Sequence, residues 1–213
     1  MTEDHFWAPR RCLREPIPQI LEAAQLLSSA VDAHLADDLV LAESLIRSAD
    51  IPEIGEWTES IWGKEDQSIL RVRKVEPAPP SLPYELRPTP RAPVLETKRK
   101  VVERDGYRCR FCGIPVIDPK LRDKLRKLYP NALRWARPNA RQHSAFQCMW
   151  LQYDHVLPNS RGGDSSIENL VVTCSACNFG RMERTLEEVG LQDPRLHPVT
   201  RSSWDGLERL FAR

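Results

Sequence analysis

The hydrophobic residues of the first fifty positions recur at helical spacing. One run, at alternating steps of three and four, consists of Ile17, Ile20, Ala24, Leu27, Val31 and Leu35. A second run, after a polar break at residues 36–38, consists of Leu39, Ala42, Ile46 and Ala49. Such spacing gathers apolar side chains on one helix face, and Pro52 ends the second run because proline disfavours helix at the residue before it. The pattern predicts two amphipathic helices, followed by a shorter one over Ile54, Trp57 and Ile61.

The apolar face of these helices has two interpretations. It packs within a small helical domain, or it serves as a surface for dimerisation or for a partner protein. The stripe is too short for a coiled coil, which needs three or four sustained heptads.

A proline-rich stretch divides the chain. Residues 77–93, PAPPSLPYELRPTPRAP, contain seven prolines, which is typical of an extended, semi-rigid segment. We expect a spacer or a strap along the surface rather than a ligand for a proline-recognising domain. The boundary separates a helical domain over residues 1–76 from a second domain over residues 94–213.

In the second domain the pattern switches between helix and strand. Residues 94–106 predict a short helix that ends at Gly106. Residues 149–156 and the segment LVVTC at 170–174 are rich in apolar, aromatic and β-branched residues, which favours two strands. A short helix carrying Asn178 follows the second strand. Thr185 and Glu188 match a capping box before a further helix, and Ser203 begins a last short one.

Charge separates the two domains. The net charge of +1 combines −7 over residues 1–76, with 8 Lys/Arg against 15 Asp/Glu, and +8 over residues 77–213, with 23 against 15. A basic half suggests a phosphate-rich ligand. The chain has no run of eighteen apolar residues, so we expect no membrane span. It lacks the start of a secretory signal, so we expect a cytoplasmic location.

A basic insertion occupies residues 118–147, with eight Lys/Arg against two acids. Its leucines Leu121, Leu125 and Leu128 recur at helical spacing. The charges are either the solvated face of this helix or an arm that contacts nucleic acid. The candidates for such contacts are Lys120, Lys124, Lys127, Arg134, Arg137 and Arg141.

Four of the six cysteines form two pairs, Cys109-x-x-Cys112 and Cys174-x-x-Cys177. This spacing lets both thiolates of a pair reach one tetrahedral ion at about 2.3 Å, and two pairs make a closed, structural zinc site. Redox chemistry would need a single pair in a βαβ context, which is absent here. The sequence therefore predicts a structural zinc ion that clamps together segments 61 residues apart.

Polar residues occupy each junction between the predicted strands and helix. Asp154 and His155 end the first strand, Gly162-Gly163 lies in the loop, Asn169 precedes the second strand, and Asn178 follows the second cysteine pair. This order resembles the HNH endonuclease family, specifically bacterial members that contain zinc knuckles. The resemblance covers residues 104–184. It implies an α+β fold in which an N-terminal helical region precedes a ββα-metal nuclease domain clamped by the four-cysteine zinc site.

The resemblance also implies roles for individual residues. Asp154 and Asn178 correspond to the ligands of a catalytic metal, and His155 to the general base. Asn169 corresponds to a residue that holds the loop and supports His155. A carboxylate and an amide oxygen suit Mg²⁺ or Mn²⁺ better than zinc.

Two arginines are further candidates for contact with the nucleic-acid backbone. Arg181 matches a position that is often basic in the family, and Arg161 lies beside the glycine turn, where a guanidinium is suited to grip phosphate. An exposed arginine without a role is the other interpretation of Arg161.

The sequence therefore predicts a metal-dependent HNH endonuclease that hydrolyses DNA, and the family's habits suggest defence against phage or other foreign DNA. Two alternatives stay open. One is a zinc-knuckle module that binds nucleic acid without cutting it, and the other is an HNH enzyme that cleaves RNA. Residues 1–76 are the expected surface for a protein partner or self-association.

Overall fold

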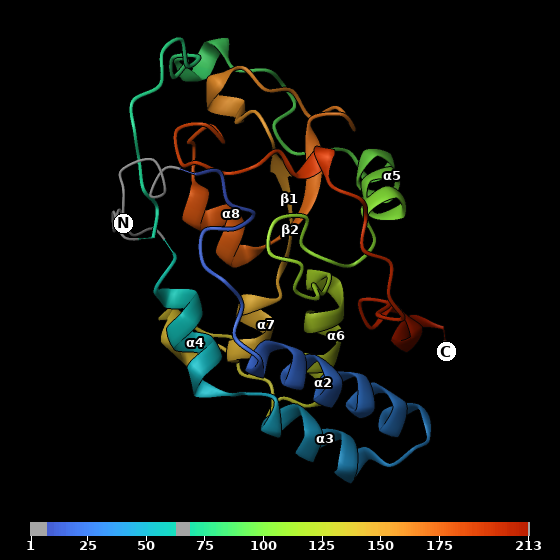
Figure 1. Cartoon of the computed structure of the whole chain (residues 1–213). Helices are drawn as coiled ribbons and strands as arrows, with labels where there is room; N and C mark the ends of the chain where they lie inside the picture. The colour runs from blue at the N-terminus through green and yellow to red at the C-terminus, as the bar shows by residue number, and fades with distance from the viewer. Residues whose placement is uncertain (1–7, 63–68, 213) are drawn as a thin grey trace.

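A two-stranded sheet lies among short helices, with three helices of the N-terminal region at one end of the molecule (Figure 1). The computed structural model describes residues 8–62 and 69–212. Its helices are α2 (Gln19–Leu35), α3 (Leu39–Ser48), α4 (Pro52–Glu59), α5 (Leu95–Asp105), α6 (Pro119–Leu128), α7 (Ser144–Cys148) and α8 (Ser175–Arg181). Its strands are β1 (Leu151–His155) and β2 (Leu170–Cys174). Short 3-10 turns are η1 (Tyr84–Leu86), η2 (Asn139–Arg141), η3 (Asn159–Arg161), η4 (Pro194–Leu196) and η5 (Glu208–Phe211).

The N-terminal helices follow the apolar pattern of the sequence. Helix α2 buries Ile20, Leu27 and Val31, and α3 buries Ala42 and Ile46 against it. Pro52 is the first residue of α4, a position where its missing N–H leaves no helical hydrogen bond unmade. The expected helices are therefore confirmed. Residues 1–7 and 63–68 of the proposed first domain lie outside the described residues.

The N-terminal helices are packed directly against the second half of the chain. Helix α4 contacts α7, and the indole N–H of Trp62 donates to the carbonyl of Ser175 at 3.0 Å. His143 Nε2 lies 2.8 Å from the carbonyl oxygen of Ile46. Gly180 of α8 lies so close to Ile61 that an added Cβ would meet Ile61 Cγ2 at 2.4 Å. Buried residues of both halves form one contiguous hydrophobic cluster.

The sheet is an antiparallel hairpin in which Asp154 pairs with Val171 and His155 with Leu170. Cys174 ends β2 and is also the N-cap of α8, so the second strand continues directly into the helix. The order strand, loop, strand, helix predicted from the sequence is present. Asp154 and His155 are the last two residues of β1, and both line one pocket although adjacent residues of a strand point to opposite faces.

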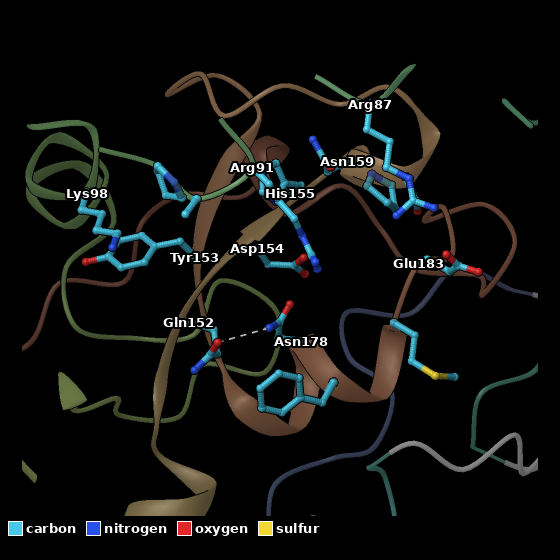
Figure 2. A pocket seen from close by; sticks show the side chains of 16 residues that line it. Arg87, Arg91, Lys98, Gln152, Tyr153, Asp154, His155, Asn159, Asn178 and Glu183 are labelled. Carbon is cyan, nitrogen blue, oxygen red and sulfur yellow. Dashed lines mark hydrogen bonds between the residues drawn. The ribbon is translucent and has the colours of Figure 1, made fainter. Parts of the chain in front are cut away.

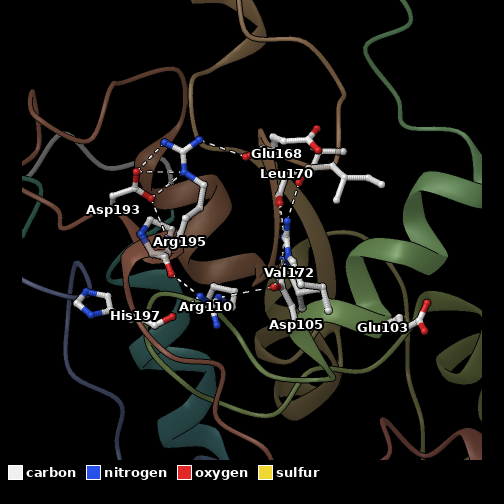
Figure 3. A network of polar contacts seen from close by, with 12 residues as sticks. Glu103, Asp105, Arg110, Glu168, Leu170, Val172, Asp193, Arg195 and His197 are labelled. Carbon is white, nitrogen blue, oxygen red and sulfur yellow. Dashed lines mark hydrogen bonds and ion pairs between the residues drawn. The ribbon is translucent and has the colours of Figure 1, made fainter.

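A buried carboxylate ties α5 to the second strand (Figure 3). Asp105 is 1% exposed, and it accepts hydrogen bonds from the backbone N–H of Val172 at 2.9 Å and from Arg104 at 2.8 Å. Arg110, within the first cysteine pair, donates to the carbonyl of His197 at 2.7 Å. Helix α5 ends where Gly106 takes a positive φ of 71°, as the sequence predicts. These contacts fix the first cysteine pair beside β2.

Two expected helices near the C-terminus are wrong in type. Both capping-box hydrogen bonds between Thr185 and Glu188 form, at 2.8 and 3.3 Å, but residues 186–190 make turns instead of a helix. Gly190 has a φ of 61°, which bends the chain out of helical geometry. The final segment forms only the 3-10 turn η5.

No helix in the described ranges is long and apolar enough to span a membrane.

Candidate active site

The polar residues at the ends of β1 and α8 open into one pocket of about 820 Å³. Asp154, His155 and Asn178 all line it, and their side chains point toward one another (Figure 2). The hairpin supplies the first two and α8 supplies the third. The structure thus brings together three of the residues that the sequence singled out, although they come from separate elements of the chain.

Asp154 is held by a buried arginine. Its carboxylate accepts from Arg181 Nη2 at 2.7 Å and from Nε at 3.3 Å, and Asp154 is 5% exposed. Burial raises the pKa of Asp154, and the Arg181 guanidinium opposes this rise by favouring the carboxylate. Each carboxylate oxygen has two lone pairs, so this pairing still leaves acceptor capacity for a ligand in the pocket.

His155 is oriented by a serine of the loop between the strands. Its Nε2 lies 2.9 Å from Ser165 Oγ, and that hydroxyl is also 2.9 Å from the carbonyl oxygen of Pro90 and 2.8 Å from that of Arg91. The single hydroxyl proton is directed to these carbonyls, so Oγ accepts from His155 and Nε2 carries a proton. The neutral ring then has its lone pair on Nδ1.

The surroundings favour this neutral form of His155. Burial lowers the pKa of His155, and the positive charges of Arg91 and Arg181 lower it further, against a weaker opposing effect of Asp164. An unprotonated imidazole nitrogen at neutral pH is what a general base requires.

Asn169 links the two ends of the loop that follows β1. Its side chain accepts from Leu157 N–H at 2.8 Å and donates to the carbonyls of Leu157 at 3.1 Å and Asp164 at 2.8 Å. Gly163 lies beside this contact, where an added Cβ would be 1.8 Å from the Leu157 oxygen. Asn169 itself has no place in the lining of the pocket. Asn169 therefore holds the two ends of the loop together, and His155 lines the pocket.

The four paired cysteines form a second cluster. Their sulfur atoms all lie within 4.8 Å of one another, and Cys112 Sγ is 3.6 Å from Cys174 Sγ. Tetrahedral zinc with bonds of about 2.3 Å requires sulfur atoms about 3.8 Å apart. Three of the cysteines are buried. The donor type and spacing therefore fit a closed zinc site.

The pocket donors differ in kind from the sulfur cluster. Asp154 and Asn178 offer oxygen atoms, and the amide nitrogen of Asn178 is directed to Gln152 Oε1 at 3.4 Å, which orients its oxygen away from Gln152. Hard oxygen donors of this kind fit Mg²⁺ or Mn²⁺, which retain several waters and need few protein ligands.

The comparisons with known proteins agree with this geometry. Residues 144–192 match the family model described as HNH endonuclease. Residues 144–192 are therefore similar to an HNH endonuclease domain. The matched HNH segment includes α7, both strands, the loop and α8, and with them Asp154, His155 and Asn178. Neither the curated proteins nor the solved structures include a significant match.

The structure engages the two candidate arginines of the HNH segment, Arg161 and Arg181, in contacts within the protein. Arg181 is 1% exposed and, besides Asp154, donates to the carbonyls of His155 at 2.5 Å and Arg184 at 2.7 Å. Its guanidinium therefore has no open face for a nucleic acid, which differs from the expected contact. Arg161 pairs with Glu188 at 3.1 Å and donates to the carbonyl of Pro79 at 2.5 Å. It holds the proline-rich segment.

The basic insertion lies outside the HNH pocket. Lys124 donates to the carbonyl of Leu210 at 2.6 Å, and Arg134 pairs with Asp50 at 3.0 Å. Lys120 lines a neighbouring pocket, whereas Lys127, Arg137 and Arg141 are exposed at other places on the surface. The part of the insertion predicted as a helix is α6, which buries Leu121 and Leu125 but leaves Leu128 43% exposed.

Sequence reasoning missed the residues that complete the wall of the HNH pocket. Arg87, Arg91 and Lys98 line it from the proline-rich segment and α5. Ser165, which contacts His155, was also missed. The only signal was the presence of two arginines among the prolines, since nothing in the sequence shows where such a segment lies.

Proposed function

We propose that this protein is a metal-dependent endonuclease that hydrolyses phosphodiester bonds of DNA. The observation that carries the proposal is the convergence of Asp154, His155 and Asn178 in one pocket. The contact of His155 Nε2 with Ser165 supports it, because it favours the tautomer with its lone pair on Nδ1. The HNH family match supports nuclease activity in general.

His155 acts as the general base in this proposal. Hydrolysis of a phosphodiester requires a water molecule that loses its proton as it attacks phosphorus. Nδ1 of the neutral ring accepts that proton, while Ser165 keeps Nε2 protonated and fixes the ring plane. Asn169 keeps the loop closed around Leu157, two residues after His155.

Asp154 and Asn178 would hold the divalent metal, Mg²⁺ or Mn²⁺. When bound, such an ion stabilises negative charge on the phosphate and the leaving oxygen. Arg181 positions Asp154 and opposes the rise in its pKa that burial causes, which favours the carboxylate form. We assign Arg181 this positioning role in place of a direct contact with the nucleic acid.

The cysteine cluster would hold a structural zinc ion. Cys109 and Cys112 precede the HNH segment, and Cys174 and Cys177 join β2 to α8. A zinc ion there clamps the first pair to the element that carries Asn178. The metal thereby fixes the position of α8 relative to the hairpin that carries His155.

The wider setting that we propose is defence against foreign DNA in the cytoplasm. The defence role rests on the family resemblance alone. We also propose the division into residues 1–76, 77–93 and 94–213. In this division the acidic N-terminal region regulates the nuclease or binds a partner.

The test is cleavage of supercoiled plasmid by the purified, zinc-loaded protein with Mg²⁺, with Mn²⁺ and with EDTA, beside a matched RNA. We expect nicked or linear plasmid with either metal and none with EDTA. Cleavage of RNA alone would identify the enzyme as a ribonuclease. Stable binding of DNA without cleavage of either substrate would identify a binding module and overturn the proposal.

A further inference from the structure

Most arginines around the HNH segment are already engaged by partners within the protein. Each of six pairs with a carboxylate at 3.1 Å or less, and they are Arg104, Arg122, Arg161, Arg181, Arg195 and Arg209. Arg110 is engaged by two backbone carbonyls. An arginine in such a pair has little left to offer a phosphate. Cations that could contact a substrate are therefore those without such a pair.

Three cations on the wall of the pocket differ from that group. Arg91 is exposed, and Arg87 and Lys98 are partly exposed. Within the described ranges, none of the three forms a salt bridge. Arg87 donates only its Nε, to the carbonyl of Leu82 at 3.0 Å, so both terminal nitrogens stay available. The Lys98 ammonium lies 5.6 Å from the centre of the Tyr153 ring, beside the pocket.

These cations face the site from a segment that is fixed in place. The backbone N–H of Leu82 donates to the carbonyl of Ser160 at 2.7 Å. Asn159 donates to the carbonyl of Pro88 at 2.8 Å, and Ser165 reaches the carbonyl of Arg91 at 2.8 Å. The loop between β1 and β2 thus binds the proline-rich segment at three points. The segment forms a wall of the active-site pocket instead of a free spacer between two domains.

The charge of the pocket is suited to an anion. Its lining includes Arg87, Arg91 and Lys98 but only two acids, Asp154 and Glu183, and Asp154 is already paired with Arg181. Figure 2 shows Arg91 beside His155, with Arg87 and Lys98 on either side. Guanidinium groups bind phosphate oxygens through paired N–H donors, and their low hydration favours this contact.

We propose that Arg87, Arg91 and Lys98 form a phosphate-binding rim, through which the 82–98 segment holds the DNA backbone beside His155. This inference rests on the proposed function and names the part of the protein that grips the substrate. Arg87 and Arg91 lie four residues apart, so their Cα atoms are separated by at most about 14 Å. Both therefore reach phosphates of the same short stretch of DNA.

The test measures binding of a short DNA duplex against salt concentration. The full chain carries His155→Ala throughout, so that binding is measured without cleavage. Each contact with a phosphate contributes about 0.9 to the slope of log affinity against log salt. We expect Arg87→Ala, Arg91→Ala and Lys98→Ala each to lower the slope by about 0.9, whereas Arg91→Lys keeps most of it.

Arg47→Ala is the matched control. Arg47 is an exposed cation on α3, paired with Glu43 and remote from the pocket. Its loss should leave the slope unchanged. If the slope falls equally in Arg47→Ala and Arg91→Ala, the effect is one of net charge, and the proposal of a phosphate-binding rim is contradicted. Unchanged melting temperatures of the rim variants show that they fold.

Plasmid cleavage by the wild type, with His155 intact, separates this inference from the proposed function. Cleavage by wild type together with unaltered slopes in all three rim variants overturns the rim and leaves the nuclease standing. Lowered slopes without any cleavage by wild type support the rim and contradict the nuclease.

Discussion

At the scale of single residues, the chemistry of the site depends on where one proton lies. Ser165 uses its hydroxyl proton on the carbonyls of the proline-rich segment and accepts from His155 Nε2. In the proposed mechanism the base is therefore Nδ1 of His155, and Ser165 sets its orientation. Arg181 plays a comparable part for Asp154.

Replacement of Ser165 tests this orientation. In Ser165→Ala the histidine loses a hydrogen bond worth about 1 kcal/mol, so we expect kcat to fall about five- to tenfold while KM for DNA stays the same. Ser165→Thr restores a hydroxyl and should recover most of the rate. A steady-state comparison of the three proteins makes the measurement, and an unchanged kcat in Ser165→Ala would contradict the assigned role.

What the sequence predicts at this scale is limited by side-chain geometry. Asp154, His155 and Asn178 are identifiable because fixed spacing along a strand, loop and helix carries them to one pocket. The partners of Arg161 and Arg181 are not identifiable, because a guanidinium on a long, flexible side chain reaches whichever acceptor the tertiary fold supplies. Arg161 finds Glu188, and Arg181 finds Asp154. In both cases a carboxylate within the protein pairs with the guanidinium.

At the scale of elements, the loop between β1 and β2 connects most of the functional parts. It carries Ser165, it is closed by Asn169, and it binds the proline-rich segment through Asn159. Hydrophobic periodicity predicted the N-terminal helices, and apolar, aromatic and β-branched composition predicted the two flanking strands. The sequence did not predict the turns at residues 186–190, because the capping box there is followed within five residues by Gly190, which takes a positive φ.

Two glycine substitutions test the importance of this loop. Gly163→Ala forces a methyl group against the Leu157 carbonyl and should lower the free energy of unfolding by more than about 1 kcal/mol. Gly55→Ala is the control. Gly55 lies inside α4, and its added Cβ would meet Ser144 Cβ at 3.7 Å, an ordinary van der Waals distance. That change should raise stability by about 0.5–1 kcal/mol. Urea titration measures both, and a Gly163→Ala protein as stable as wild type would argue against the close approach.

The cysteine cluster predicts a measurable metal content. We expect about one zinc per purified chain by elemental analysis, and a lower melting temperature after the zinc is removed, because metal binding contributes to folding. Cys109→Ser should lose the metal. Cys12→Ser should keep it, because Cys12 is buried outside the cluster. A metal-free protein that melts at the same temperature as the loaded one would contradict a structural zinc site.

At the scale of the whole molecule, the helical region and the HNH segment share their core. Ile46 of α3 and Trp57 of α4 belong to the same buried cluster as Phe146 and Val172. The opposite charges of the two halves, read from the sequence, gave no indication of this packing, because net charge does not describe which apolar faces meet.

The shared core predicts that both halves unfold together. Ile46→Ala removes a fully buried side chain and should cost about 2–5 kcal/mol. We expect loss of helical circular dichroism and release of zinc to shift to the same lower urea concentration. Release of zinc at the wild-type midpoint, after the helical signal has been lost, would show that the halves unfold independently.

The measurement that tests the central claim most directly is the single-turnover rate of plasmid cleavage by wild type and by His155→Ala, both zinc-loaded and supplied with Mg²⁺. Loss of a general base costs about 10²–10⁴-fold in rate, so we expect a fall of that size with DNA binding and melting temperature preserved. Cleavage by His155→Ala at the wild-type rate would contradict the account and place the chemistry outside this pocket.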